Sequence, residues 1–186
     1  MKFFVKLLLS FPFLGKAIRS SDAYILGQLQ SLFANNDYLE CLSESLDYLK
    51  KPNSKGDQLL WWEFASFAIL STAKLQDRDA YNELVILLAD REIPSNKRSV
   101  AESLTKLSML GYFFQDKEGM LKLAEQAKKA DESWAEPEFL LGWYQLPSMD
   151  SVTHLKNAIN IDSEYLSRIK SDSTCLKYPE VIEQLK

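Results

Sequence analysis

The chain has 186 residues, of which 46% are hydrophobic and 26% charged, and its formal net charge is -4. This composition suits one globular domain spanning residues 1–186 and excludes a disordered chain. All four charged residues within residues 1–20 are basic, so the remainder carries a net charge of -8. An acidic body repels a phosphate backbone, and no stripe of lysine and arginine with interleaved aromatics counters this, which excludes nucleic acid as an expected partner.

Residues 1–20 combine a basic start with an apolar run that Lys6 interrupts. Lys2, Lys6 and Ser10 recur every four residues, which favours an amphipathic N-terminal helix that packs on the end of the domain. Two alternatives remain open for this segment. It could be a secretory signal with a poor cleavage motif near Lys16, or a helix that lies on an anionic membrane surface. The run is too short and too interrupted to span a bilayer.

Apolar residues three or four positions apart predict helices along the rest of the chain. Glycine and proline number only six each, and no Asn-Gly or Asp-Gly pair marks a hairpin, so sheet is disfavoured. The polar residues 35–37 favour a turn inside a first helical pair over residues 22–51. A second pair is predicted over residues 57–91 with its turn at residues 77–79, and Trp61 is expected in its core.

A third pair is predicted over residues 96–130, turning at residues 115–116, and a fourth over residues 135–161, joined at residues 147–148. Residues 163–186 are expected to form a C-terminal cap. The turns recur after 42, 38 and 33 residues, at Asp37, Asp79, Lys117 and Asp150. A drifting period of this length is typical of a repeat array.

The strongest repeat pattern lies in residues 101–163. Small or apolar residues occupy the positions at which two antiparallel helices would touch, namely Leu104, Leu107, Ser108, Met120, Ala124, Ala127, Leu141, Gly142, Ser151, Leu155 and Ala158. This pattern resembles the tetratricopeptide repeat family. The resemblance implies an all-α fold, a superhelical stack of antiparallel helix-turn-helix pairs (a TPR-like solenoid), with about four pairs between N-terminal and C-terminal capping helices.

The chain departs from the family pattern at two places. Asp131-Glu132 stands where the family closes its unit with an acidic residue and proline, and the stretch from Gly142 to Ser151 is three residues shorter than in the family unit. The fourth pair is therefore expected to have a shortened helix or a tighter turn around Pro147.

Enzyme chemistry has little support in the sequence. His154 is the only histidine, and it is expected as a surface or partly packed side chain rather than a catalytic base or metal ligand. No GxSxG, Walker, GxGxxG or HExxH motif is present. We therefore expect no catalytic residues and no cofactor.

A metal site is also not expected. Asp77, Asp79 and Glu83 lie at a turn and a helix start, where acidic residues cap helices and favour the positive end of the helix dipole. Cys41 and Cys175 lie far apart and have no CxxC neighbour, so neither a zinc site nor a redox pair is indicated. Reduced thiols in the cytoplasm fit this pattern.

The family resemblance also implies a binding surface, because the first helix of each pair lines a concave groove in tetratricopeptide proteins. The groove positions carried over to this chain are Trp62, Ser66, Ile69, Lys106, Met109, Phe113, Phe139 and Trp143. Their aromatic and weakly charged character suits a peptide or helix of another protein. Packing of these side chains against a neighbouring helix or residues 1–20, and self-association, remain open.

The expected function is that of a non-catalytic protein–protein interaction module in the cytoplasm, such as an adaptor, a chaperone-like factor or an inhibitor of the immunity type. The alternative is an envelope- or membrane-associated scaffold directed by residues 1–20, exported if residues 1–17 act as a signal. An enzyme is a distant third. That option would need a deep pocket in which His154 meets two or more carboxylates.

Overall fold

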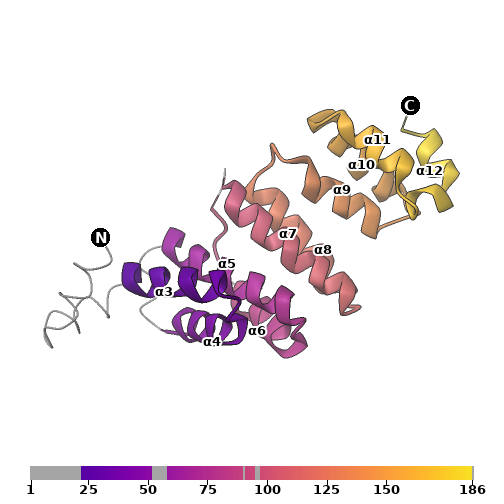
Figure 1. Cartoon of the computed structure of the whole chain (residues 1–186). Helices are drawn as coiled ribbons and strands as arrows, with labels where there is room; N and C mark the ends of the chain where they lie inside the picture. Colours follow the sequence, from indigo (N-terminus) through magenta and orange to yellow (C-terminus); the bar gives the residue numbers. More distant parts are fainter. Residues whose placement is uncertain (1–21, 52–57, 90, 95–96, 186) are drawn as a thin grey trace, which may run out of the picture. The chain divides into compact units, whose positions relative to one another are not determined.

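The computed structural model describes residues 22–51, 58–89, 91–94 and 97–185, and these residues form helices and connecting segments with no strand (Figure 1). The all-α prediction is therefore confirmed for the described part of the chain. The expectations for residues 1–20 lie outside it.

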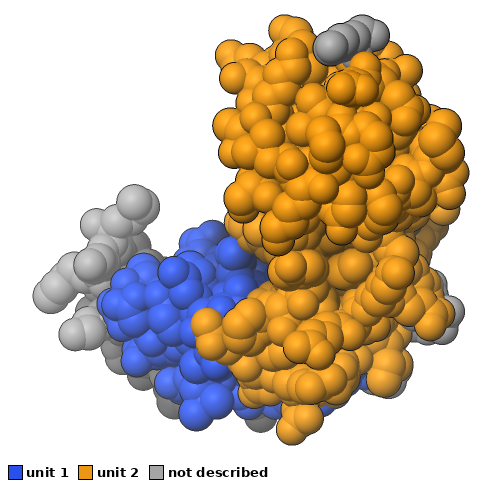
Figure 2. All heavy atoms as spheres, turned by 90° about the vertical axis from the view of Figure 1, so that its right-hand side faces the viewer, with its two compact units in different colours: residues 1–75 blue, residues 76–186 orange. Residues whose placement is uncertain are grey.

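The helices belong to two compact units, Met1–Leu75 and Gln76–Lys186, which Figure 2 shows in blue and orange. The division falls inside the predicted second pair. Its first helix, α5 (Gln58–Leu75), belongs to unit 1, and its second helix, α6 (Arg78–Ala89), belongs to unit 2.

Unit 1 contains α5 and the two helices before it, α3 (Asp22–Ala34) and α4 (Tyr38–Leu49). The most extensive contact in this unit lies between α4 and α5, where the Tyr48 ring stacks on Phe64 with 3.6 Å between ring centroids. Helix α5 is largely apolar and covered, apart from the exposed Glu63 and Lys74. Trp61 is 1% exposed, which confirms its predicted place in the core.

Unit 2 continues after α6 with four helices that pack as two successive pairs, α7 (Arg98–Phe113) on α8 (Lys117–Ala130) and α9 (Ala135–Tyr144) on α10 (Met149–Ile161). Two glycines allow these pairs to approach closely. A Cβ on Gly111 would lie 3.0 Å from the Cβ of Met120, and one on Gly142 would lie 2.6 Å from Cγ of Leu155. This packing of adjacent helices is compatible with a helical repeat.

The turns between helices reuse one backbone geometry. Asn36, Gln76 and Gln115 adopt left-handed conformations, with φ of 65°, 53° and 62°. Each is followed by an aspartate. After α7, the N–H of Asp116 donates to the carbonyl of Gly111 at 2.8 Å, the closing bond of a Schellman motif.

Two of these aspartates also cap the following helix, since Asp77 accepts from the N–H of Ala80 at 3.0 Å and Asp116 accepts from that of Gly119 at 2.9 Å, whereas the Asp37 side chain makes no such bond. The fourth turn differs. It contains a cis peptide bond before Pro147, and Ser148 replaces the aspartate as the cap of α10. The expected departure of the fourth pair is therefore seen both at this turn and in α9, which has 10 residues against 16 in α7.

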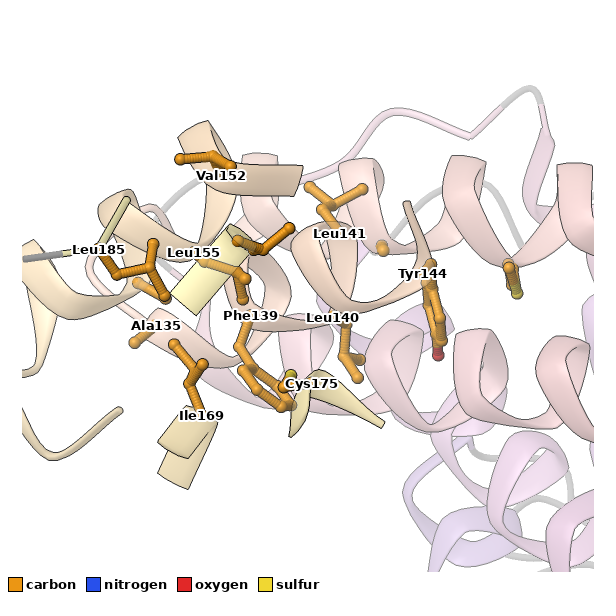
Figure 3. Close-up of a cluster of buried hydrophobic side chains, with 14 residues drawn as sticks. Ala135, Phe139, Leu140, Leu141, Tyr144, Val152, Leu155, Ile169, Cys175 and Leu185 are labelled. Atoms are coloured by element: carbon orange, nitrogen blue, oxygen red, sulfur yellow. The ribbon is translucent and has the colours of Figure 1, made fainter. Parts of the chain in front are cut away.

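The C-terminal segment covers the α9/α10 pair where a cap is expected. It consists of α11 (Glu164–Ser171), the short 3-10 helix η2 (Cys175–Lys177) and α12 (Pro179–Glu183). Ile169 and Cys175 from this segment lie beside Phe139 of α9 (Figure 3). These contacts fix the position of α11 against α9.

Candidate functional site

A pocket of about 290 Å³ opens among α7, α9 and the end of α11, entirely within unit 2. We call it the aromatic pocket. It is lined by Met109 and Tyr112 of α7, by Phe139, Leu140, Trp143 and Tyr144 of α9, and by Arg168 and Asp172 at the end of α11. Its lining is thus mainly aromatic, with one positive and one negative side chain.

Helix α7 presents a row of exposed apolar side chains at the edge of this pocket. Met109, Tyr112 and Phe113 are 52%, 55% and 58% exposed. Lys106 is also exposed, and it precedes Met109 by the three positions that place two residues on one helical face. Exposed apolar side chains that gather on one face commonly mark an interaction site.

The pocket wall is built from aromatic rings that contact one another. The ring centroid of Trp143 lies 5.0 Å from that of Tyr112 and 5.6 Å from that of Tyr144. The hydroxyl of Ser108, which donates to the carbonyl of Met120 at 2.7 Å, is 3.4 Å from that of Tyr144, within hydrogen-bond distance, and burial raises the pKa of Tyr144. Mutual ring contacts and this hydrogen bond restrict the rotamers, so the wall is largely formed before any ligand arrives.

Asp172 supplies the negative charge of the pocket. Its Oδ1 accepts from Trp143 Nε1 at 3.1 Å and from the N–H groups of Thr174 and Cys175 at 2.8 and 2.9 Å. Burial on its own raises the pKa of this carboxyl, but these hydrogen bonds outweigh it and hold the pKa below its ordinary value. Asp172 is therefore ionised at neutral pH.

Arg168 supplies the positive charge, but it is already engaged. Its guanidinium binds both carboxylate oxygens of Glu136, with 2.9 Å from Nη2 to Oε1, and the hydroxyl of Tyr165 donates to the same carboxylate at 2.6 Å. The guanidinium also lies 4.0 Å from the ring centroid of Phe139. This ion pair neutralises the Arg168 charge within the protein.

A second hollow of about 560 Å³ adjoins the aromatic pocket, and both are lined by Tyr112 and Tyr144. Phe113, Lys117 and Met120 are among its other lining residues. The two hollows therefore flank the tyrosine pair and give the α7/α9 face two recesses.

The structure places the eight sequence-predicted groove residues in different settings. Met109, Phe139 and Trp143 meet in the aromatic pocket, Phe113 lines the second hollow, and Lys106 lies on the exposed face of α7. Phe139 is only 3% exposed, so it contributes to the floor of the pocket rather than to its rim.

The three positions carried over to α5 lie differently. Trp62 and Ile69 are 2% and 0% exposed, and Ser66 is half-buried with its hydroxyl donating to the carbonyl of Trp62 at 2.8 Å. The exposed charged residues of α5, Glu63 and Lys74, are eleven positions apart and so share one face, whereas Trp62 and Ile69 lie on a covered one. Trp62 and Ile69 therefore offer no open surface, and we do not carry them into the site.

Sequence reasoning missed Tyr112, Tyr144, Arg168 and Asp172. Tyr112 follows Met109 by three residues and shares its face, which is a signal the sequence did contain. Arg168 and Asp172 belong to the segment that was interpreted only as a cap. Their approach to α9 depends on tertiary packing, for which the sequence has no local pattern.

His154 takes part in a partly buried network of side chains that do not line the pocket. Its Nδ1 lies 2.6 Å from Oε2 of Glu138, whose carboxylate also pairs with Lys128 Nζ at 2.9 Å and accepts from Asn157 Nδ2 at 3.2 Å. Burial opposes the charge on Glu138, but the bonds to His154 and Lys128 keep its pKa lowered. The network joins α8, α9 and α10, and His154 is partly packed, as predicted.

The described residues contain no group of three or more histidine, cysteine, aspartate or glutamate side chains placed to hold a metal ion. No helix in the described ranges is long and apolar enough to cross a membrane. Comparisons of this chain with protein-family models, with curated proteins and with solved structures find no match.

Proposed function

We propose that this chain is a non-catalytic protein-binding module of the helical-repeat type, and that it binds a segment of another protein on the α7/α9 face. The observation that carries the proposal is the row of Met109, Tyr112 and Phe113, each more than half exposed, beside a recess whose aromatic wall is already formed.

Exposure of three large apolar side chains on one helix costs solvation free energy that burial by a partner would recover, at about 25 cal/mol per Å². Interfaces concentrate binding energy in a few aromatic, methionine and arginine residues that fill recesses. The α7/α9 face offers such residues from three helices.

The size of the recess supports a protein segment rather than a metabolite. Small-molecule sites usually have volumes of about 300–1,000 Å³, and the aromatic pocket, at about 290 Å³, lies just below this range. A space of this size suits one or two side chains of a partner. The adjoining hollow would receive the neighbouring side chains of the same segment.

We further propose that the helical repeat is of the tetratricopeptide type. Support comes from the left-handed turns at Asn36, Gln76 and Gln115 and from the close helix packing at Gly111 and Gly142. Helices α7 and α9 are the first helices of their pairs, which are the helices that line the groove in that family. The free, buried thiols of Cys41 and Cys175 favour the cytoplasm as the proposed compartment.

The test is affinity purification from cells of the native host with four forms of the chain: wild type, Phe113→Ala, Trp143→Ala and Ile86→Ala. Ile86 is the matched control, since it lies on α6 and is 73% exposed. We expect a partner that wild type and Ile86→Ala retain and that both aromatic variants lose by about tenfold or more, which corresponds to about 1.4 kcal/mol. Equal recovery with all four forms would show that this face does not bind the partner.

A further inference from the structure

We propose that the aromatic pocket recognises a basic side chain, lysine or arginine, in the bound segment, and that Asp172 is the charged group that selects it. This inference rests on the proposed function, because it names the chemistry of the partner at the same face.

Hydrogen bonds hold the Asp172 carboxylate in place, and it can still accept further hydrogen bonds. Its N–H donors, the indole of Trp143 and the backbones of Thr174 and Cys175, all bind Oδ1. Within the described residues, Oδ2 receives no N–H hydrogen bond, although the thiol of Cys175 contacts the carboxylate as a weak donor. An ionised carboxylate accepts several hydrogen bonds, so a cation entering the pocket finds an oriented acceptor.

The charge on Asp172 is not compensated by a cation in the described part of the chain. The salt bridges formed there by Arg98, Lys128, His154 and Arg168 go to other carboxylates. Arg168, the basic residue of the pocket lining, is held by Glu136. The pocket therefore presents one unpaired negative charge.

The aromatic walls suit the rest of a basic side chain. Lysine and arginine have long apolar stems that pack along rings while the charged group reaches a polar partner, and a cation over a tyrosine or tryptophan face is attracted by the ring. Tyr112 and Trp143 are T-shaped, with an interplanar angle of 63°. The rings of Tyr112 and Trp143 and the Asp172 carboxylate thus line the same pocket. In addition, residues 21–186 carry a net charge of -8, which attracts a basic segment from a distance.

The test uses a peptide library in which one central position is lysine, arginine, norleucine, glutamine or glutamate and the flanking positions are randomised. The library is panned against the full chain as wild type, Asp172→Asn and Asp150→Asn. Asparagine at position 172 keeps an oxygen for the N–H donors while removing the charge. Asp150 is exposed on α10, so Asp150→Asn changes the net charge equally at another place.

We expect wild type and Asp150→Asn to enrich lysine or arginine about tenfold over norleucine, and Asp172→Asn to lose this preference while still enriching peptides with apolar flanks. Equal enrichment of basic and norleucine peptides by wild type would overturn the inference and leave the proposed function standing. Failure to enrich any peptide class, together with unchanged partner recovery by Phe113→Ala, would instead remove the proposed function.

A second measurement needs no variant and covers the case in which Asp172→Asn does not fold. The affinity of wild type for an enriched basic peptide should fall as sodium chloride rises from low salt to about 0.5 M, because salt screens exposed charges. Salt-independent affinity would overturn the inference. So would a dimer in sedimentation that Phe113→Ala dissociates, since a second copy would then occupy this face.

Discussion

Helices α5 and α7 are both rich in apolar residues, and they use them in opposite ways. In α5, Trp62 and Ile69 are buried, whereas Met109 and Phe113 of α7 are more than half exposed. All four residues occupy positions that the tetratricopeptide resemblance assigns to a groove. The difference shows that a repeat position sets the side of a helix on which a residue lies, while the neighbouring helices decide whether that side is covered.

The contrast between α5 and α7 would fail most clearly if the buried indole of Trp62 contributed nothing to stability. We expect Trp62→Ala to lower the free energy of unfolding by about 3–5 kcal/mol, the usual cost of removing a large buried aromatic side chain. Urea unfolding followed by circular dichroism would measure the loss. A cost below about 1 kcal/mol would mean that the Trp62 side chain is not packed in the way its 2% exposure indicates.

Helix α9 has a covered side and an open side of its own. Glu138 lies on the side that packs against α10, and the other side lines the aromatic pocket. The folded protein lowers the pKa of Glu138, so the network stabilises the fold above the unfolded pKa of about 4.3 and loses this effect as pH falls through the folded value. We expect Glu138→Gln to cost about 1.5–3 kcal/mol at pH 7, the range for hydrogen bonds to a charged group.

The same variant should also flatten the fall in stability between pH 6 and pH 3, because glutamine does not titrate. Denaturant unfolding at several pH values would show this. Glu118→Gln is the matched control, as Glu118 is exposed in the first turn of α8. A pH profile of Glu138→Gln that parallels wild type would mean that the network does not contribute to acid sensitivity.

The contact of α9 with α10 also depends on Gly142. We expect Gly142→Ala to destabilise the chain by about 1–3 kcal/mol, since the added Cβ would lie 2.6 Å from Cγ of Leu155 and force the pair apart. Gly27→Ala in α3 is the contrasting variant, because its Cβ would meet nothing within 4 Å. It should be neutral or stabilise by about 0.4–1 kcal/mol. Thermal unfolding of Gly142→Ala and Gly27→Ala measures both effects. Equal changes in Tm would contradict the close packing of α9 on α10.

The smallest effect is expected at the exposed side of α7. Phe113→Ala should change the free energy of unfolding by no more than about 0.5 kcal/mol, as surface substitutions usually do. The same urea titration used for Trp62→Ala measures it. A loss comparable with that of Trp62→Ala would show that the Phe113 ring supports the fold, and the contrast between α5 and α7 would disappear.

The sequence predicted helices and turns well because both depend on local patterns. The apolar spacing placed α7 and α8, and the polar residues 35–37 and 115–116 marked the turns that follow α3 and α7. The left-handed conformation of Gln76 and Gln115 was not predictable, since such positions usually hold glycine or asparagine. The acid that meets His154 lies sixteen positions earlier on another helix, at Glu138, and such tertiary neighbours leave no periodic trace.

The pocket was predictable only in part for the same reason. Met109, Phe139 and Trp143 were predicted as groove residues because they lie on the first helices of their pairs, and the structure brings them together. Asp172, which gives the pocket its charge, comes from a segment that the family pattern does not cover. Its place depends on the packing of Ile169 and Cys175 against Phe139.

The left-handed turns have a consequence for how such a chain can change over evolutionary time. The bonds from Asp37 N–H to Leu32 O and from Asp116 N–H to Gly111 O join each turn to the last turn of the helix before it. Each closure is local to the end of one helix, so a change in the length of the helix that follows leaves the end of α3 or of α7 with the same geometry.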